Sequence, residues 1–189
     1  MAQYEAVLAL DGQNLAAARS LEALYRADGA WEKLIAVLQH HASLTQDRKE
    51  LTGLLVQMGD VWWKELGRAD RAEAMYASAL EGDPEARPAV SQLARLHEQG
   101  GNWNLALEML QREVKLAPAG DAVELQARIG RIQEDMLHDR AAAKLAYARA
   151  LDADPGHLAS LRALRAVAEA ERDRDAYLRY LSAEARYVD

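Results

Sequence analysis

Apolar residues recur three and four positions apart along nearly the whole chain, which is the spacing of an amphipathic helix. The pattern is clearest between Thr52 and Pro84, where it forms two faces separated by Gly67. The first face consists of Leu55, Met58, Gly59 and Trp62, and the second of Ala72, Met75, Tyr76, Ala79 and Leu80. Because glycine and the Asp-Pro pair interrupt helices, this stretch predicts two helices joined by a tight turn.

The same helix pair recurs along the sequence. Ala72, Tyr76 and Pro84 return 34 residues later as Ala106, Leu110 and Pro118, and 37 residues further on as Ala143, Tyr147 and Pro155. Gly59 and Gly130 are 71 residues apart, as are Ala72 and Ala143. A period in the mid-thirties predicts a helical solenoid, in which each repeat buries its apolar face against its neighbours.

These residues resemble the tetratricopeptide repeat family. The motif Gly59-x2-Trp62…Ala72-x3-Tyr76…Pro84 follows the family pattern with one extra residue in the turn, and the copy at 129–155 does likewise. The copy at 93–118 has the family's length, without the extra residue in the turn. Small residues stand where helices approach closely, and large ones fill the remaining holes. The resemblance is strong over residues 52–155, and it implies an all-α solenoid of about eleven antiparallel helices in a right-handed superhelix.

The repeat pattern predicts one solenoid over residues 1–189. The expected division is a half repeat at 1–12 and repeats at about 14–46, 47–85, 86–119, 120–156 and 157–189. Because the chain begins inside a repeat, we expect it to be a piece of a longer protein. The expected helix caps are Asn14, Asn102 and Asp121, together with a capping box formed by Asp47 and Glu50.

Composition narrows the function. The chain has 189 residues, half of them apolar, without cysteine and with a net charge of −7. The lack of cysteine excludes disulfides and thiol chemistry. The negative charge argues against nucleic acid and anionic membranes as main partners. With no signal peptide or long apolar span in the sequence, we expect a cytoplasmic protein, and 18 Arg against five Lys favour a bacterial source.

Catalytic motifs are missing from the sequence. It has no Gly-rich phosphate loop, no HExxH and no Gly-x-Ser-x-Gly. The five histidines are scattered, and the adjacent His40 and His41 point to different faces of a helix. The carboxylates Asp60, Glu65, Glu98 and Glu134 fit a solvated helix surface. We therefore expect neither an enzyme nor a cofactor or metal site.

The resemblance places a concave groove on the exposed side of each first helix, where family members bind peptides. Carried over by position, the groove residues are Arg19, Arg26, Gln57, Asp60, Trp63, Gln92, Arg95, Arg128, Arg131 and Leu164. The planar guanidinium of arginine suits carboxylates and aromatic stacking. The expected partner is therefore another protein, either a peptide or a folded domain, and acidic partners are included. The competing interpretation is that these arginines pair with Glu98 or Glu134 on their own helices.

Two functions follow from this sequence. One is a protein-binding scaffold that uses the Arg-bearing groove. The other is an assembly module that stacks end to end on further repeats of the same protein. Apolar side chains at both ends, such as Val7 and Leu181, predict weak self-association through the helix ends. The lysine and asparagine arrangement with which some family members hold a chaperone's C-terminal carboxylate is not present, so chaperone binding is not expected.

Overall fold

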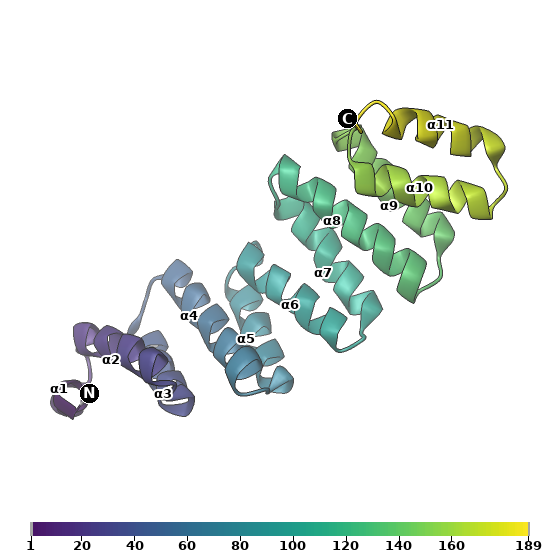
Figure 1. Ribbon diagram of the computed structural model, residues 1–189. Helices are drawn as coiled ribbons and strands as arrows, with labels where there is room; N and C mark the ends of the chain where they lie inside the picture. Colours follow the sequence, from purple (N-terminus) through teal and green to yellow (C-terminus); the bar gives the residue numbers. More distant parts are fainter. Residues whose placement is uncertain (1, 189) are drawn as a thin grey trace. The chain divides into compact units, whose positions relative to one another are not determined.

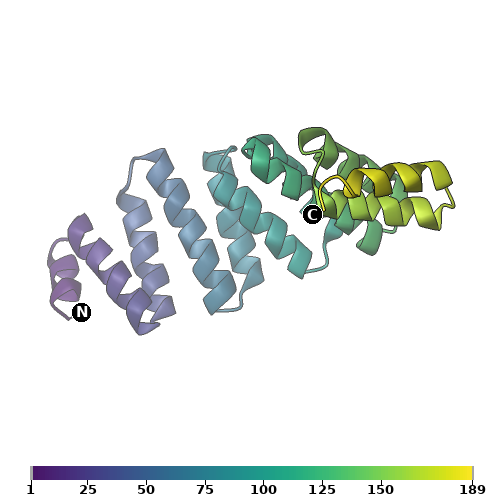
Figure 2. The same ribbon diagram turned by 45° about the horizontal axis from the view of Figure 1, so that its top comes forward.

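The computed structural model describes residues 2–188, which form eleven α-helices, two short π-helices and no strand (Figures 1 and 2). The α-helices are α1 (Ala2–Leu10), α2 (Leu15–Asp28), α3 (Trp31–Leu44), α4 (Arg48–Asp60), α5 (Ala69–Gly82), α6 (Arg87–Gln99), α7 (Trp103–Leu116), α8 (Ala119–Arg131), α9 (Arg140–Ala153), α10 (Leu158–Ala170) and α11 (Arg174–Glu184). The predicted all-α solenoid class is confirmed. The handedness of the superhelix stays a prediction. None of the described helices combines the length and apolarity needed to cross a bilayer.

The chain divides into two compact units, and the boundary falls between Leu96 and His97. In the first unit α2 packs on α3 and α4 packs on α5. The core there includes the fully buried Leu21, Leu34 and Leu38. In the second unit α8 packs on α9 and α10 packs on α11. The division into numbered repeats within a single solenoid stays a prediction.

Close approach of paired helices depends on a glycine opposite a tyrosine. A Cβ added at Gly59 would lie 2.4 Å from the Tyr76 ring, and one at Gly130 would lie 2.5 Å from the Tyr147 ring. Both tyrosines are buried in the contact between the first and second helix of a pair. The predicted role of the small residues is therefore confirmed at both positions.

The extra residue of two repeats lies inside a helix rather than in the turn. The π-helices η1 (Val61–Glu65) and η2 (Ile132–Met136) directly follow α4 and α8. A π-helical turn accommodates one more residue than an α-helical turn, and such bulges are frequent at functional sites. The prediction of a longer turn was wrong, because the insertion widens the end of the first helix.

The turn after each first helix holds a left-handed residue. It is Gly29, Gly67 or Gly101 in three turns, with φ of 68°, 65° and 72°. In the remaining two turns the residue is His138, with φ of 54°, or Arg172, with φ of 58°. Non-glycine residues pay a steric cost in this region, so these two turns are locally strained.

The predicted helix caps are partly right. Asn14 accepts a hydrogen bond from the Ala17 amide at 3.0 Å, as expected for an N-cap. Asp47 accepts one from the Lys49 amide at 2.9 Å.

The other predicted caps need correction. The Glu50 carboxylate bonds Thr45 and Arg19, so it does not complete a capping box with Asp47. Asp121 lies in the first turn of α8, because that helix begins after Pro118. Asn102 occupies the N-cap position of α7 without a side-chain hydrogen bond to the helix.

Candidate partner-binding surface

Polar side chains of the first helices bond to one another across each unit. Arg19 of α2 lies 2.6 Å from Glu50 of α4, and Arg26 donates to Gln57 at 2.8 Å. Further along, Gln92 of α6 donates to Asp60 of α4 at 2.7 Å, and Arg128 of α8 lies 2.6 Å from Glu98 of α6. These contacts join neighbouring helices, so the interpretation of pairing along a single helix was wrong. The exposed ion pair of Arg19 with Glu50 contributes about 0–1 kcal/mol.

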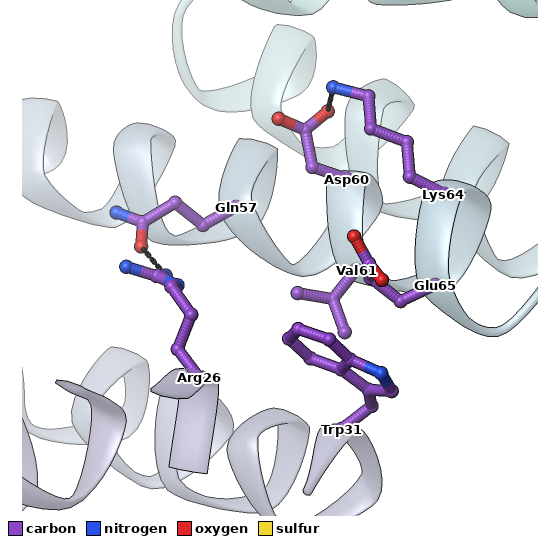
Figure 3. Close-up of a pocket in the computed structure, with 7 residues that line it drawn as sticks. All are labelled: Arg26, Trp31, Gln57, Asp60, Val61, Lys64 and Glu65. Carbon is purple, nitrogen blue, oxygen red and sulfur yellow. Dashed lines mark hydrogen bonds and ion pairs between the residues drawn. The ribbon is translucent and has the colours of Figure 1, made fainter. Parts of the chain in front are cut away.

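A cavity of about 460 Å³ lies at the turn end of the first helices in the first unit (Figure 3). Its walls come from the end of α2, the start of α3, and α4 with η1. They consist of Arg26, Trp31, Gln57, Asp60, Val61, Lys64 and Glu65. Figure 3 shows the Trp31 indole beside Val61, with the Arg26–Gln57 and Lys64–Asp60 contacts above it.

A second cavity of about 460 Å³ occupies the equivalent place in the second unit. It is lined by Glu98, Gln99, Trp103, Arg128, Arg131, Ile132, Asp135 and Met136. Trp103 follows Trp31 by 72 residues, and Ile132 follows Val61 by 71, which is the spacing of the sequence repeat. The same two-repeat frame, including the π-helix, therefore builds both cavities.

The two cavities carry exchanged charges. The hydrogen-bonded pair across the first helices is Arg26 with Gln57 in one cavity and Glu98 with Arg128 in the other. The position that Asp60 occupies in the first cavity is occupied by Arg131 in the second, and the position of Lys64 is occupied by Asp135. Each cavity has two basic and two acidic side chains, but their positions in the shared frame differ.

Asp60 is fully engaged by its own unit. It accepts hydrogen bonds from Tyr76 and Gln92, both at 2.7 Å, and lies 3.2 Å from the Lys64 ammonium. Burial, reinforced by the bond to Asp60, raises the pKa of the Tyr76 hydroxyl well above its ordinary value. Asp60 therefore holds α4, α5 and α6 together, and its contribution to the cavity is secondary.

Arg131 is placed differently. It is exposed, and within residues 2–188 it has no hydrogen bond or ion pair. The nearby Tyr147 hydroxyl donates to Glu134 at 3.1 Å. Burial and then Glu134 raise the pKa of Tyr147, and the positive charge of Arg131 counteracts that rise. Arg131 is thus an exposed, unpaired cation in the wall of the second cavity, within the part of the chain that the structure describes.

Five predicted groove residues line neither cavity, namely Arg19, Trp63, Gln92, Arg95 and Leu164. Arg95 is exposed on α6, and Trp63 is half-buried in η1. Leu164 is 2% exposed and packs against Ala143 and Tyr147, so its assignment to the groove was wrong. The physical reason is that α10 uses this side to pack on α9.

Sequence reasoning missed the two tryptophans of the cavities. The signal that could have found them is the Gly-x-Trp spacing shared by Gly29-x-Trp31 and Gly101-x-Trp103. Among the described residues, no group of three or more His, Cys, Asp or Glu is placed to hold a metal ion.

The fold defines a helical-repeat scaffold. Two family models, both described as tetratricopeptide repeat, match residues 17–52 and 65–129. The chain belongs to the tetratricopeptide repeat family.

Solved structures share the fold at low sequence identity. MamA from Desulfovibrio magneticus RS-1, residues 41 to the end, is 20% identical with a TM-score of 0.61, covering 94% of this chain and 95% of that one. YrrB, described as a TPR protein with an unusual peptide-binding site, is 18% identical with a TM-score of 0.62, covering 97% and 91%. BtubC from P. vanneervenii is 16% identical with a TM-score of 0.60, covering 98% and 85%. The comparison with curated proteins found no match.

Proposed function

We propose that this chain is a scaffold that binds a peptide segment or a folded protein on the first-helix surface of each unit, beside the two cavities. The observation that carries the proposal is the recurrence of one cavity in both units, 71 to 72 residues apart, with a tryptophan and a π-helix in each wall. Packing alone does not require an open cavity at this place. A recurring concave site with convergent polar groups is typical of ligand binding.

The predicted groove residues support this placement. Arg26, Gln57 and Asp60 line the first cavity, and Arg128 and Arg131 line the second. The exposed guanidinium groups of Arg95 and Arg131 are available to carboxylates of a partner. The net charge of −7 favours protein partners over nucleic acid.

Site-specific photo-crosslinking tests the proposal. A crosslinking amino acid at Arg95 or Gln57 reports on the first helices, and one at Glu108 or Arg149 reports on exposed positions of the second helices α7 and α9. We expect one partner band from the first set and none from the second. The opposite pattern would overturn the proposal.

Charge reversal then tests the arginines on the captured partner. We expect Arg95→Glu combined with Arg131→Glu to weaken binding at least tenfold while leaving the circular dichroism spectrum unchanged. Full-strength binding by this variant would place the partner elsewhere on the chain.

A second candidate is the assembly module. It is favoured by the exposed leucines of α11, Leu178 and Leu181. These side chains lie away from both cavities, so stacking on a further copy would leave the cavities open. Light scattering at increasing protein concentration measures such stacking.

A further inference from the structure

The second cavity opens onto exposed apolar side chains. Met136 in its wall is 49% exposed. A neighbouring hollow of about 330 Å³ shares Trp103 and is also lined by Leu105 and Leu137, which are 46% and 36% exposed. The four side chains therefore form one continuous surface, here called the Trp103 patch. Contiguous exposed apolar surface of this kind marks interaction sites.

The first unit shows that the fold does not require this apolarity. The residue equivalent to Met136, 71 positions earlier, is Glu65, and the residue equivalent to Leu105, 72 positions earlier, is Lys33. Both charged residues are exposed in the same structural frame. Met136 and Leu105 are therefore additions to the repeat, whereas Trp103 and Leu137 stand where the first unit has Trp31 and Leu66, which pack against its core.

The charges beside the patch select among partners. Arg128 is held by Glu98 at 2.6 Å, whereas Arg131 has no ion pair in the described part of the chain. A carboxylate beside Arg131 would gain a charge-assisted, bidentate contact. Asp135 lies in the same wall, where its carboxylate would repel a partner's carboxylates and would accept hydrogen bonds from backbone N–H groups of a bound segment.

We propose that the Trp103 patch and Arg131 bind a protein segment in which bulky aliphatic side chains flank an aspartate or glutamate. The aliphatic groups cover the Trp103 ring and the adaptable Met136 side chain, and the acidic group meets Arg131. This inference rests on the proposed function, and it names the chemistry of the segment and the cavity that takes it.

Nuclear magnetic resonance of the indole N–H groups tests the proposal on the whole chain. The protein has four tryptophans, and Trp103→Phe assigns the resonance of interest. The probes are three blocked pentapeptides, acetyl-Gly-Leu-Glu-Leu-Gly-amide and its versions with Lys for Glu or Ala for both Leu. We expect the Glu peptide to shift the Trp103 resonance saturably, and each altered peptide to bind at least fivefold more weakly.

Variants built from the repeat itself provide matched tests. Met136→Glu and Leu105→Lys introduce the residues that the first unit carries at the equivalent positions, so the helical signal and melting temperature should be kept. We expect each variant to weaken binding of the Glu peptide at least fivefold. Arg131→Gln should abolish the preference for the Glu peptide over the Lys peptide. The control Glu65→Gln in the first cavity should change neither the binding of the Glu peptide nor this preference.

Three outcomes would overturn the inference. They are the absence of a Trp103 shift at millimolar Glu peptide, equal or tighter binding of the Lys peptide, and unchanged binding by both Met136→Glu and Leu105→Lys. If crosslinking at Arg95 still captures a partner in those cases, the proposed function stands and only the inference about the Trp103 patch fails.

Discussion

The ring of Tyr76 lies against Gly59, and its hydroxyl reaches the next residue, Asp60, at 2.7 Å. One side chain of α5 therefore fills the space left by a missing Cβ on α4 and also satisfies a carboxylate there. Tyr147 makes the corresponding contact with Gly130. This relationship fixes the distance between the two helices of a pair, and so fixes where the cavity residues Asp60 and Arg131 stand.

Gly59→Ala should destabilise the protein by about 1–3 kcal/mol, because the added methyl group overpacks a buried contact. The aromatic ring is buried between helices and has little room to move. The matched control is Gly53→Ala on the same helix, where an added Cβ meets nothing within 4 Å. The control should gain about 0.5–1 kcal/mol from lower unfolded-state entropy. Urea unfolding measures both, and equal effects of the two changes would contradict the packing argument.

Stability should fall at alkaline pH through Tyr25. Its hydroxyl donates to Glu5 at 2.5 Å, and this bond, followed by burial, raises the pKa of Tyr25 to about 12. The unfolded chain, with an ordinary tyrosine pKa of about 10, loses this proton first. The contribution of Tyr25 is therefore constant below about pH 10 and is lost between about pH 10 and 12.

Tyr25→Phe removes this titration. We expect the variant to be less stable than the parent chain at about pH 8, and the difference to shrink as the pH rises toward about 12. Chemical denaturation at several pH values measures it, with the exposed Tyr4→Phe as the control. A difference that is constant with pH would show that the bond to Glu5 is not the cause.

The two strained turns can be relaxed. His138→Gly and Arg172→Gly each place glycine at a left-handed position, with φ of 54° and 58°. Each should stabilise the chain by about 0.5–1 kcal/mol, because relief of the steric cost exceeds the entropy that glycine adds to the unfolded state. The reverse change, Gly67→Ala, should be destabilising. Thermal unfolding of the three variants checks the sign, and a loss of stability in both glycine variants would show that their side chains hold the turns.

Periodicity predicted most of the helical architecture. The eleven α-helices of residues 2–188 match the expected number, because apolar spacing and the Gly and Pro stops are local signals. The π-helices were not predicted. Whether an extra residue enters a turn or a helix end depends on the helix packed alongside, and spacing in one segment does not carry that information.

The candidate site was only partly predictable. The positions of Arg95 and Arg131 in the repeat correctly predicted that both side chains are exposed. The prediction from repeat position failed at Leu164, because this leucine of α10 is buried against Tyr147. It also missed Trp31 and Trp103, since their role depends on a cavity formed jointly with the following π-helix. Local sequence cannot reveal a space between two helices that are distant along the chain.

The last prediction concerns self-association through α11. Leu178 and Leu181 of this helix are 47% and 37% exposed. Tyr187 is also 50% exposed, but its ring lies against Gly156, where an added Cβ would meet it at 2.9 Å. Tyr187 therefore partly covers the loop before α10, and the two leucines offer the cleaner test.

Light scattering at increasing protein concentration should show an average mass that rises above that of one chain. Leu178→Ser combined with Leu181→Ser should weaken this association about tenfold or more, because less apolar surface is removed from water in the contact. The control is Leu145→Ser on α9, which removes an equally apolar exposed side chain outside α11. If Leu145→Ser has the same effect, the contact is not specific to α11. A single-chain mass at every concentration would remove the support for the assembly module and leave the cavities as the surface through which this scaffold meets its partner.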